Sequence, residues 1–77
     1  MSELSRLRWR CRRGAKELDV VFTRYLEREY PSADAAHQAA FEFLLDTEDP
    51  IVMELITGRT PARSDDEAIV LNAMRGE

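Results

Sequence analysis

The sequence has few of the residues that form disulfides or bind metal ions in small proteins. Its 77 residues include one cysteine, one histidine and one lysine. A single cysteine cannot form an internal disulfide or supply a zinc site, which fits a reducing compartment. No apolar run approaches the roughly 18–20 residues that span a membrane, and no apolar stretch at the N-terminus resembles a signal peptide. We therefore expect a soluble, cytoplasmic protein without direct membrane insertion.

The chain is also too short to enclose a deep substrate cleft. A domain of this size buries only about 60% of the surface that its unfolded chain exposes, so it has one modest core. The composition, 44% hydrophobic and 34% charged, is that of a folded globular chain. We predict a single domain over residues 1–77 that is not an enzyme.

The residues that could carry chemistry lack suitable companions. His37 has no second nitrogen or sulfur ligand nearby and no nucleophile to serve, so we interpret it as a surface or packing residue. Cys11 falls on an apolar stripe, which favours a buried and inert thiol. Asp46, Glu48 and Asp49 lack the glycine and distal glutamate of a calcium loop and are interpreted as capping and helix-dipole residues. The sequence thus predicts no catalytic residue, no cofactor-binding residue and no metal site.

Charge is divided unevenly along the chain. The net charge is −4, yet residues 1–16 hold six basic residues against one acid, and the remainder holds five against fourteen. Local charges of +5 and −9 indicate a surface that steers a partner. All but one of the cations are arginine, which suits bidentate contact with carboxylates or phosphates. The sequence leaves the partner open between these two chemistries.

Apolar residues recur at helical spacing and predict a compact all-α bundle of five helices. We place the helices at about residues 3–12, 16–30, 33–46 and 50–57, with a fifth that begins after Ser64. Expected core residues on the first two helices are Leu4, Leu7, Cys11, Leu18, Val21, Phe22, Tyr25 and Leu26. Expected caps are Ser2, Ser32 and Asp49 at helix starts, Ser64 with Glu67 as a capping box, and Gly14 at the end of the first helix.

The basic N-terminal segment is the strongest candidate for function. Its arginines occur on all sides of the first helix, so they repel one another unless a partner, or the acids of helices two to four, neutralises them. Trp9 lies off the apolar stripe and has the character of an interface anchor. The Arg13–Glu17 turn would present a guanidinium, the bare backbone of Gly14 and a carboxylate side by side. The simpler alternative is a glycine C-cap followed by a charged first turn.

The run from Trp9 to Asp19, WRCRRGAKELD, resembles the RGxxE signature of the SdhE/YgfY family in its wider form W-x-C-R-R-G-x-x-E-L-D. These are small bacterial flavinylation factors related to mitochondrial succinate dehydrogenase assembly factor two. The resemblance continues in order through E-x-E-Y, F-x-x-L-L-x-x-x-D-P and a glycine-then-proline loop, at residues 27–30, 41–50 and 58–61. It covers nearly the whole chain.

The resemblance implies a five-helix bundle that binds the flavoprotein subunit of succinate dehydrogenase or fumarate reductase. It further implies that binding promotes covalent attachment of FAD to a histidine of that client. The partner-binding residues carried over are Arg13, Gly14 and Glu17, with Arg12 and Asp19 as flanking positions. Arg13 and Glu17 would pair with opposite charges on the client.

A small nucleic-acid-binding regulator that uses the arginine-rich helix is the alternative from another class. The overall charge of −4 and the absence of an evident base-reading helix argue against it. We therefore expect a protein partner and no nucleic acid.

Overall fold

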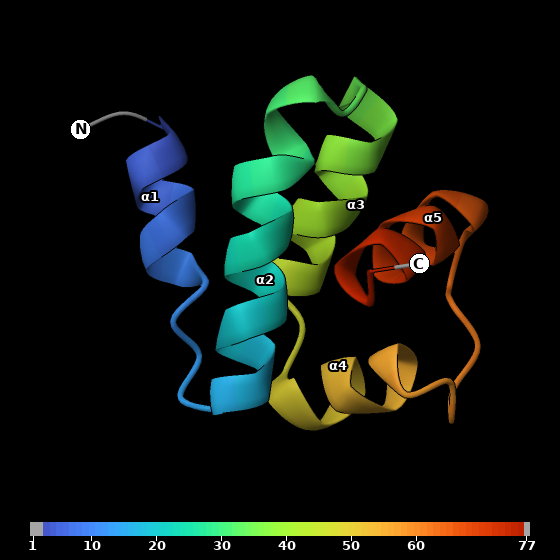
Figure 1. Ribbon diagram of the computed structural model, residues 1–77. Helices are drawn as coiled ribbons and strands as arrows, with labels where there is room; N and C mark the ends of the chain where they lie inside the picture. Colours follow the sequence, from blue (N-terminus) through green and yellow to red (C-terminus); the bar gives the residue numbers. More distant parts are fainter. Residues whose placement is uncertain (1–2, 77) are drawn as a thin grey trace.

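The computed structural model describes residues 3–76, and within them the chain forms five α-helices, one short 3-10 helix and no strand (Figure 1). The elements are α1 Glu3–Arg10, α2 Lys16–Arg28, η1 Tyr30–Ser32, α3 Ala35–Leu45, α4 Asp49–Ile56 and α5 Asp65–Met74. The prediction of an all-α, five-helix fold is confirmed.

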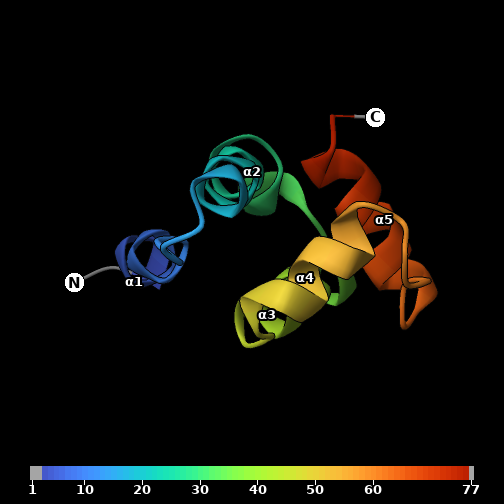
Figure 2. The same cartoon turned by 90° about the horizontal axis from the view of Figure 1, so that it is seen from below.

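The helices pack as a small globule with a radius of gyration of 11.3 Å. In Figures 1 and 2, α1 lies at the edge beside α2, and α4 lies across one end of α3. α5 packs against α2 and α3. This arrangement leaves one side of α1 facing away from the rest of the molecule.

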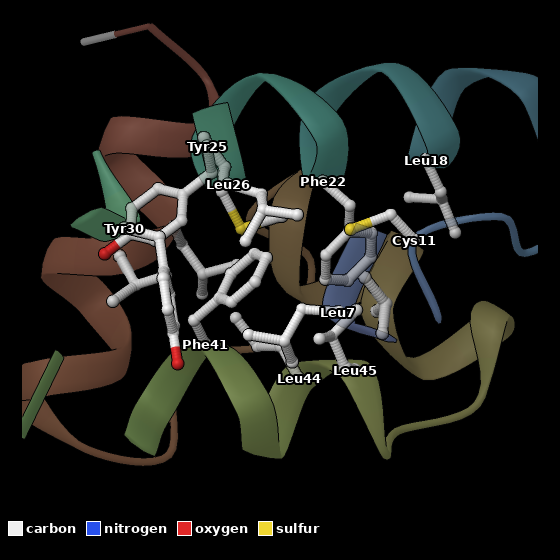
Figure 3. Close-up of a cluster of buried hydrophobic side chains, with 14 of the residues drawn as sticks. Leu7, Cys11, Leu18, Phe22, Tyr25, Leu26, Tyr30, Phe41, Leu44 and Leu45 are labelled. Atoms are coloured by element: carbon white, nitrogen blue, oxygen red, sulfur yellow. The ribbon is translucent and has the colours of Figure 1, made fainter. Parts of the chain in front are cut away.

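One hydrophobic core holds these helices together, with an aromatic cluster at one end (Figure 3). The Phe41 ring lies 4.7 Å from that of Tyr25, 5.5 Å from that of Tyr30 and 5.7 Å from that of Phe22, measured between centroids. Aromatic pairs at such distances stabilise a core beyond the area that they bury.

The predicted core faces are largely correct. Leu7, Cys11 and the expected residues of α2 are buried, apart from Val21, which packs at the core's edge. Leu4 is the exception, because its side chain is 46% exposed. The second half of α1 supplies the buried contacts, and Leu4, Ser5 and Arg6 before it are exposed to solvent.

Two predicted N-caps are wrong. Asp34, and not Ser32, caps α3 by accepting a hydrogen bond of 3.0 Å from the backbone of His37, while Ser32 belongs to the 3-10 helix η1. The N-cap of α4 is Glu48, and Asp49 is already its first helical residue. The predicted cap Ser2 lies outside the described residues.

The predicted capping box at α5 is half confirmed. Ser64 Oγ accepts a hydrogen bond of 3.1 Å from the backbone of Glu67. The Glu67 carboxylate does not return this bond to Ser64, because it accepts from the backbone of Arg63 at 3.0 Å. The Glu67 carboxylate thus binds the backbone nitrogen of Arg63, one residue before the N-cap Ser64 that the capping-box pattern indicates.

Candidate partner-binding site

The turn between α1 and α2 has the positive φ at Gly14 that the sequence predicts, but the prediction that Gly14 caps the first helix is wrong. α1 ends at Arg10, so Gly14 belongs to the connection and not to the end of the helix. Gly14 has a φ of +90°, a conformation that glycine adopts at little cost. A Cβ atom at Gly14 would meet nothing within 4 Å. The glycine is therefore needed for the path of the chain and not for packing inside the molecule, and the space beside it is open.

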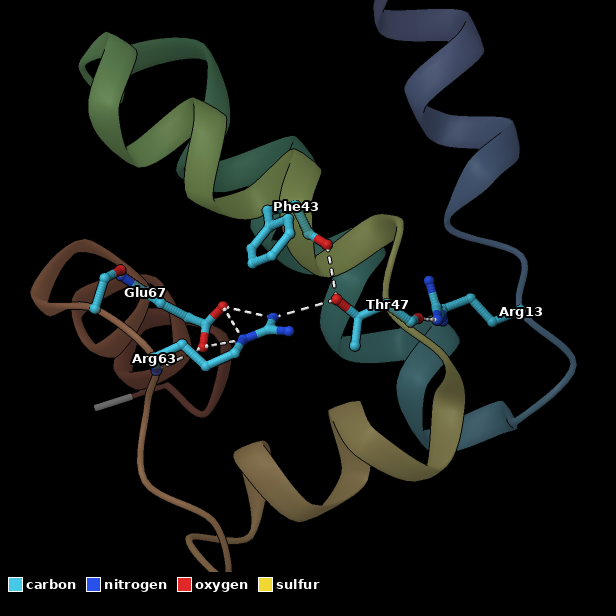
Figure 4. A network of polar contacts seen from close by, with 6 residues as sticks. Arg13, Phe43, Thr47, Arg63 and Glu67 are labelled. Atoms are coloured by element: carbon cyan, nitrogen blue, oxygen red, sulfur yellow. Dashed lines mark hydrogen bonds and ion pairs between the residues drawn. The ribbon is translucent and has the colours of Figure 1, made fainter.

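Arg13 points into the molecule. Its side chain is only 9% exposed, and its guanidinium donates to Asp49 Oδ1 at 2.6 Å, to the Leu45 carbonyl at 2.7 Å and to the Thr47 carbonyl. Figure 4 shows the contact with Thr47. The guanidinium carbon also lies 4.9 Å from the centroid of the Phe22 ring. We call this set of contacts the Arg13 latch. It fastens the α1–α2 turn to the α3–α4 connection and leaves the guanidinium few atoms with which to meet a partner.

Asp19 completes the inner side of the turn. Its Oδ1 accepts a hydrogen bond of 2.6 Å from the backbone nitrogen of Arg13, and the side chain is half-buried. Of the five residues that the sequence places at the partner site, Arg13 and Asp19 therefore stabilise the turn from within.

Arg12, Gly14 and Glu17 form the outer side and are exposed. Neither Arg12 nor Glu17 forms an ion pair with another described side chain, those of residues 4–76. The Arg12 guanidinium lies over the Trp9 ring, 5.7 Å from its centroid. The structure thus places a free carboxylate, an open backbone and an exposed cation on one turn.

Acidic residues of α2 and of the α3–α4 connection neutralise other arginines of the N-terminal segment, which is one of the two alternatives that the sequence left open. Arg8 pairs with Glu27 at 2.5 Å, and Arg10 pairs with Asp46. Asp46 is the C-cap residue of α3 and Asp49 lies in the first turn of α4, as the capping and helix-dipole interpretation expects. Their carboxylates also bind arginines, which the sequence did not predict. The acidic connection therefore holds the basic segment in place.

Cys11 is fully buried, as predicted. Burial raises the pKa of its thiol to about 11, an effect that the nearby Arg8, Arg10 and Arg13 only partly oppose. The thiol therefore stays protonated at neutral pH and is a poor nucleophile.

His37 is a packing residue between two helices. Its Nδ1 lies 3.4 Å from Asp34 Oδ1 and its Nε2 lies 3.4 Å from Asp66 Oδ1. Among the side chains of residues 4–76, no three histidine, cysteine or acidic residues are grouped so that they could hold a metal ion. No helix in the same range has the length and apolar character of a membrane span.

A second polar network, formed by Arg63, Glu67 and Thr47, was not predicted from the sequence (Figure 4). Arg63 donates to both carboxylate oxygens of Glu67, at 2.7–3.1 Å, and to Thr47 Oγ1 at 3.2 Å. The Glu67 side chain is 2% exposed. Burial raises its pKa, but hydrogen bonds from the side chain and backbone of Arg63, with its charge, outweigh burial and lower the pKa overall. The opposite charges of Arg63 and Glu67, four residues apart, are the sequence feature from which this ion pair could have been predicted.

The fold and this site define a small helical domain whose motif turn is held in place from behind by the Arg13 latch. The sequence profile of a protein family described as "Flavinator of succinate dehydrogenase" matches residues 5–76. The chain belongs to this family.

Three curated relatives, each named "FAD assembly factor SdhE", illustrate the similarity. The protein of Methylococcus capsulatus (strain Bath) is 41% identical over 75 residues, which cover 97% of this chain and 88% of the relative. That of Xylella fastidiosa (strain Temecula1) is 36% identical over 74 residues, or 96% and 76% of the two chains. That of Idiomarina loihiensis is 30% identical over 74 residues, or 96% and 82%. Among solved structures no match was found.

Proposed function

We propose that this protein is an FAD assembly factor that binds the flavoprotein subunit of succinate dehydrogenase or of fumarate reductase. Binding promotes covalent attachment of FAD to a histidine of that client. The family match over residues 5–76 supports the class of function. The observation that carries the proposal is the motif turn, where Arg12, Gly14 and Glu17 are exposed and the Arg13 latch fixes the backbone beneath them.

The exposed side of the turn suits a protein partner. The open space beside Gly14 lets a partner's backbone approach closely, since no side chain of this protein occupies it. Glu17 and Arg12 meet opposite charges of the client, and such charge pairs fix the register of an interface. Arg13 and Asp19 act as positioning residues, because their polar atoms are engaged within the turn.

The protein acts as a non-enzymatic chaperone in this proposal. The histidine and the flavin that become linked both belong to the client. A binding partner accelerates such a step by favouring the client conformation in which the two reacting groups are oriented toward each other. The assembly factor therefore needs a rigid recognition surface and no catalytic side chain.

Covalent flavin in the client tests this function directly. After denaturing gel electrophoresis, flavin fluorescence of the flavoprotein subunit should fall strongly in a strain that lacks this protein, while the subunit itself is still synthesised. A client whose flavin-linking histidine is replaced by alanine gives the background. Undiminished fluorescence in the deletion strain would contradict the proposal.

Variants of the turn test the site. Gly14→Arg and Glu17→Ala should weaken client binding, measured by calorimetry, because one fills the open space and the other removes the free carboxylate. Glu29→Ala, at the far end of α2, is the control for Glu17 and should bind as the wild type does. Helical circular dichroism should be retained in all three. Loss of helicity in the Gly14 and Glu17 variants would indicate that the turn is needed only for folding.

A further inference from the structure

Trp9 is the most exposed large hydrophobic side chain in the described part of the protein. Its exposed fraction is 70%, whereas Leu7 and Cys11, on the other side of the same segment, are buried. Tryptophan is enriched among the residues that dominate binding energy, because it buries a large area and loses little conformational freedom. Its position therefore needs an explanation that core packing does not supply.

Hollows lie beside the Trp9 ring. One has a volume of about 530 Å³ and is lined by Ser5, Arg6, Trp9 and Arg10. The other, of about 260 Å³, is lined by Ser5, Arg8, Trp9 and Arg12. We call the surface formed by Ser5, Arg6, Trp9 and Arg12 the Trp9 face. An apolar side chain of a partner could enter either hollow and pack on the indole.

The charges of the Trp9 face are not balanced by the described side chains, those of residues 4–76. Arg8 and Arg10 form ion pairs with carboxylates of this protein, whereas Arg6 and Arg12 form none with a described side chain. Arg12 is already held over the indole by a cation–π contact. Two guanidinium groups that no described carboxylate neutralises, beside an exposed aromatic ring, complement a partner surface that carries carboxylates around an apolar residue.

We infer that the Trp9 face is a second part of the client interface and binds an acidic segment of the flavoprotein that carries an exposed apolar side chain. The inference rests on the proposed function. It extends the contact surface from the motif turn, with its exposed residues Arg12, Gly14 and Glu17, along the outer side of α1. Arg12 belongs to both parts, so one client surface can cover them together.

A polyanion fits the Trp9 face less well. Three arginines of the basic segment, Arg8, Arg10 and Arg13, are engaged with carboxylates of this protein. Of the six basic residues in this segment, only Arg6, Arg12 and Lys16 then remain for phosphates, and affinity for nucleic acid rises with the number of phosphates neutralised. The acidic remainder of the chain also repels a polyanion.

Fluorine NMR can observe this face alone, because Trp9 is the only tryptophan. The protein labelled with fluorotryptophan should give a single resonance. An unlabelled flavoprotein subunit with its flavin-linking histidine replaced by alanine is added as a client that cannot complete the reaction. The resonance should shift or broaden as the complex forms, and calorimetry on the same pair reports binding independently.

Affinity measurements complete the test. Trp9→Ala should weaken client binding by about 10- to 100-fold, as for a central interface anchor. Ile69→Ala, an exposed apolar residue on α5, is the matched control and should change affinity less than about twofold. Arg12→Glu should weaken binding more than Arg59→Glu, a charge reversal in the α4–α5 connection, and the difference should shrink as salt is added.

The outcomes separate this inference from the proposed function. Binding by calorimetry with an unchanged fluorine resonance, or with equal affinities for Trp9→Ala and Ile69→Ala, would overturn the inference and leave the function standing. If the wild-type protein binds neither the flavoprotein subunit of succinate dehydrogenase nor that of fumarate reductase, both the inference and the proposed function are overturned. A resonance that moves with single-stranded RNA at physiological salt, but not with the client, would assign the Trp9 face to nucleic acid instead.

Discussion

Arg13 and Arg63 are used in the same way on opposite sides of the α3–α4 connection. Each guanidinium lies over a phenylalanine ring, Arg13 over Phe22 and Arg63 over Phe43, and each donates a hydrogen bond to Thr47. Both also bind a carboxylate. The protein therefore fixes this short connection with two arginines that enter from different parts of the chain.

The partners of the two arginines lie at different distances along the chain. Arg13 binds groups that are 32 to 36 residues away, whereas the carboxylate bound by Arg63 is only four residues away. The Arg13 latch joins α1 and the motif turn to the rest of the bundle. The Arg63 network mainly organises the start of α5. We therefore expect the loss of Arg13 to cost more stability.

Replacement of Arg13 is the most severe test of this difference. Arg13→Met should lower the free energy of unfolding by about 3 kcal/mol, because Asp49 and two carbonyls lose their donor. Urea denaturation measures the loss. Arg12→Met, at the exposed neighbouring position, should change the same quantity by less than about 0.5 kcal/mol. Equal losses in the two variants would show that the latch does not stabilise the fold.

Arg63→Met should have a smaller effect, about 2 kcal/mol in the same measurement. The buried Glu67 carboxylate loses the guanidinium but keeps the hydrogen bond from the backbone nitrogen of residue 63. A loss as large as that of Arg13→Met would remove the distinction between the two arginines.

The charge of Glu67 gives the Arg63 network a dependence on pH. Because folding lowers the pKa of Glu67, its contribution is complete above the ordinary glutamate pKa of about 4.3 and is lost as pH falls through the folded value below it. Glu67→Gln should cost about 1.5 kcal/mol at neutral pH. It should also flatten the decline of stability in acid, as followed by urea titrations at a series of pH values. A decline as steep as that of the wild type would contradict this assignment.

Gly14→Ala tests how much of the turn is set by the glycine and how much by the Arg13 latch beside it. We expect a loss of about 1 kcal/mol from the positive φ, without any steric clash. Thermal unfolding followed by circular dichroism measures it. A loss comparable to that of Arg13→Met would make the glycine, and not the latch, the main determinant of the turn.

Much of this fold is predictable because it depends on local patterns. The 3.6-residue spacing of apolar side chains locates the helices and the core of α2, and Gly14 marks a turn that needs a positive φ. Errors arise where nearby residues compete for one role. Ser32 and Asp34 are both good caps, and the 3-10 helix Tyr30–Ser32 decides between them by taking in Ser32.

The inward direction of Arg13 was not predictable from local sequence. Two of its acceptors are backbone carbonyls, which any residue type supplies, and all of them come from the α3–α4 connection. The resemblance to the SdhE family identified the motif but not which of its side chains face outward. Only the packing of α1 beside the rest of the bundle separates Arg13 and Asp19 from Arg12, Gly14 and Glu17.

Thr47 is a hydrogen-bond partner of both Arg13 and Arg63. Its carbonyl accepts from Arg13, and its hydroxyl accepts from Arg63 while donating to the Phe43 carbonyl at 2.8 Å. Neighbouring sites that share a partner are not energetically independent. Substitutions at the start of α5 therefore carry a coupling energy to the motif turn, although the two sites belong to opposite ends of the chain.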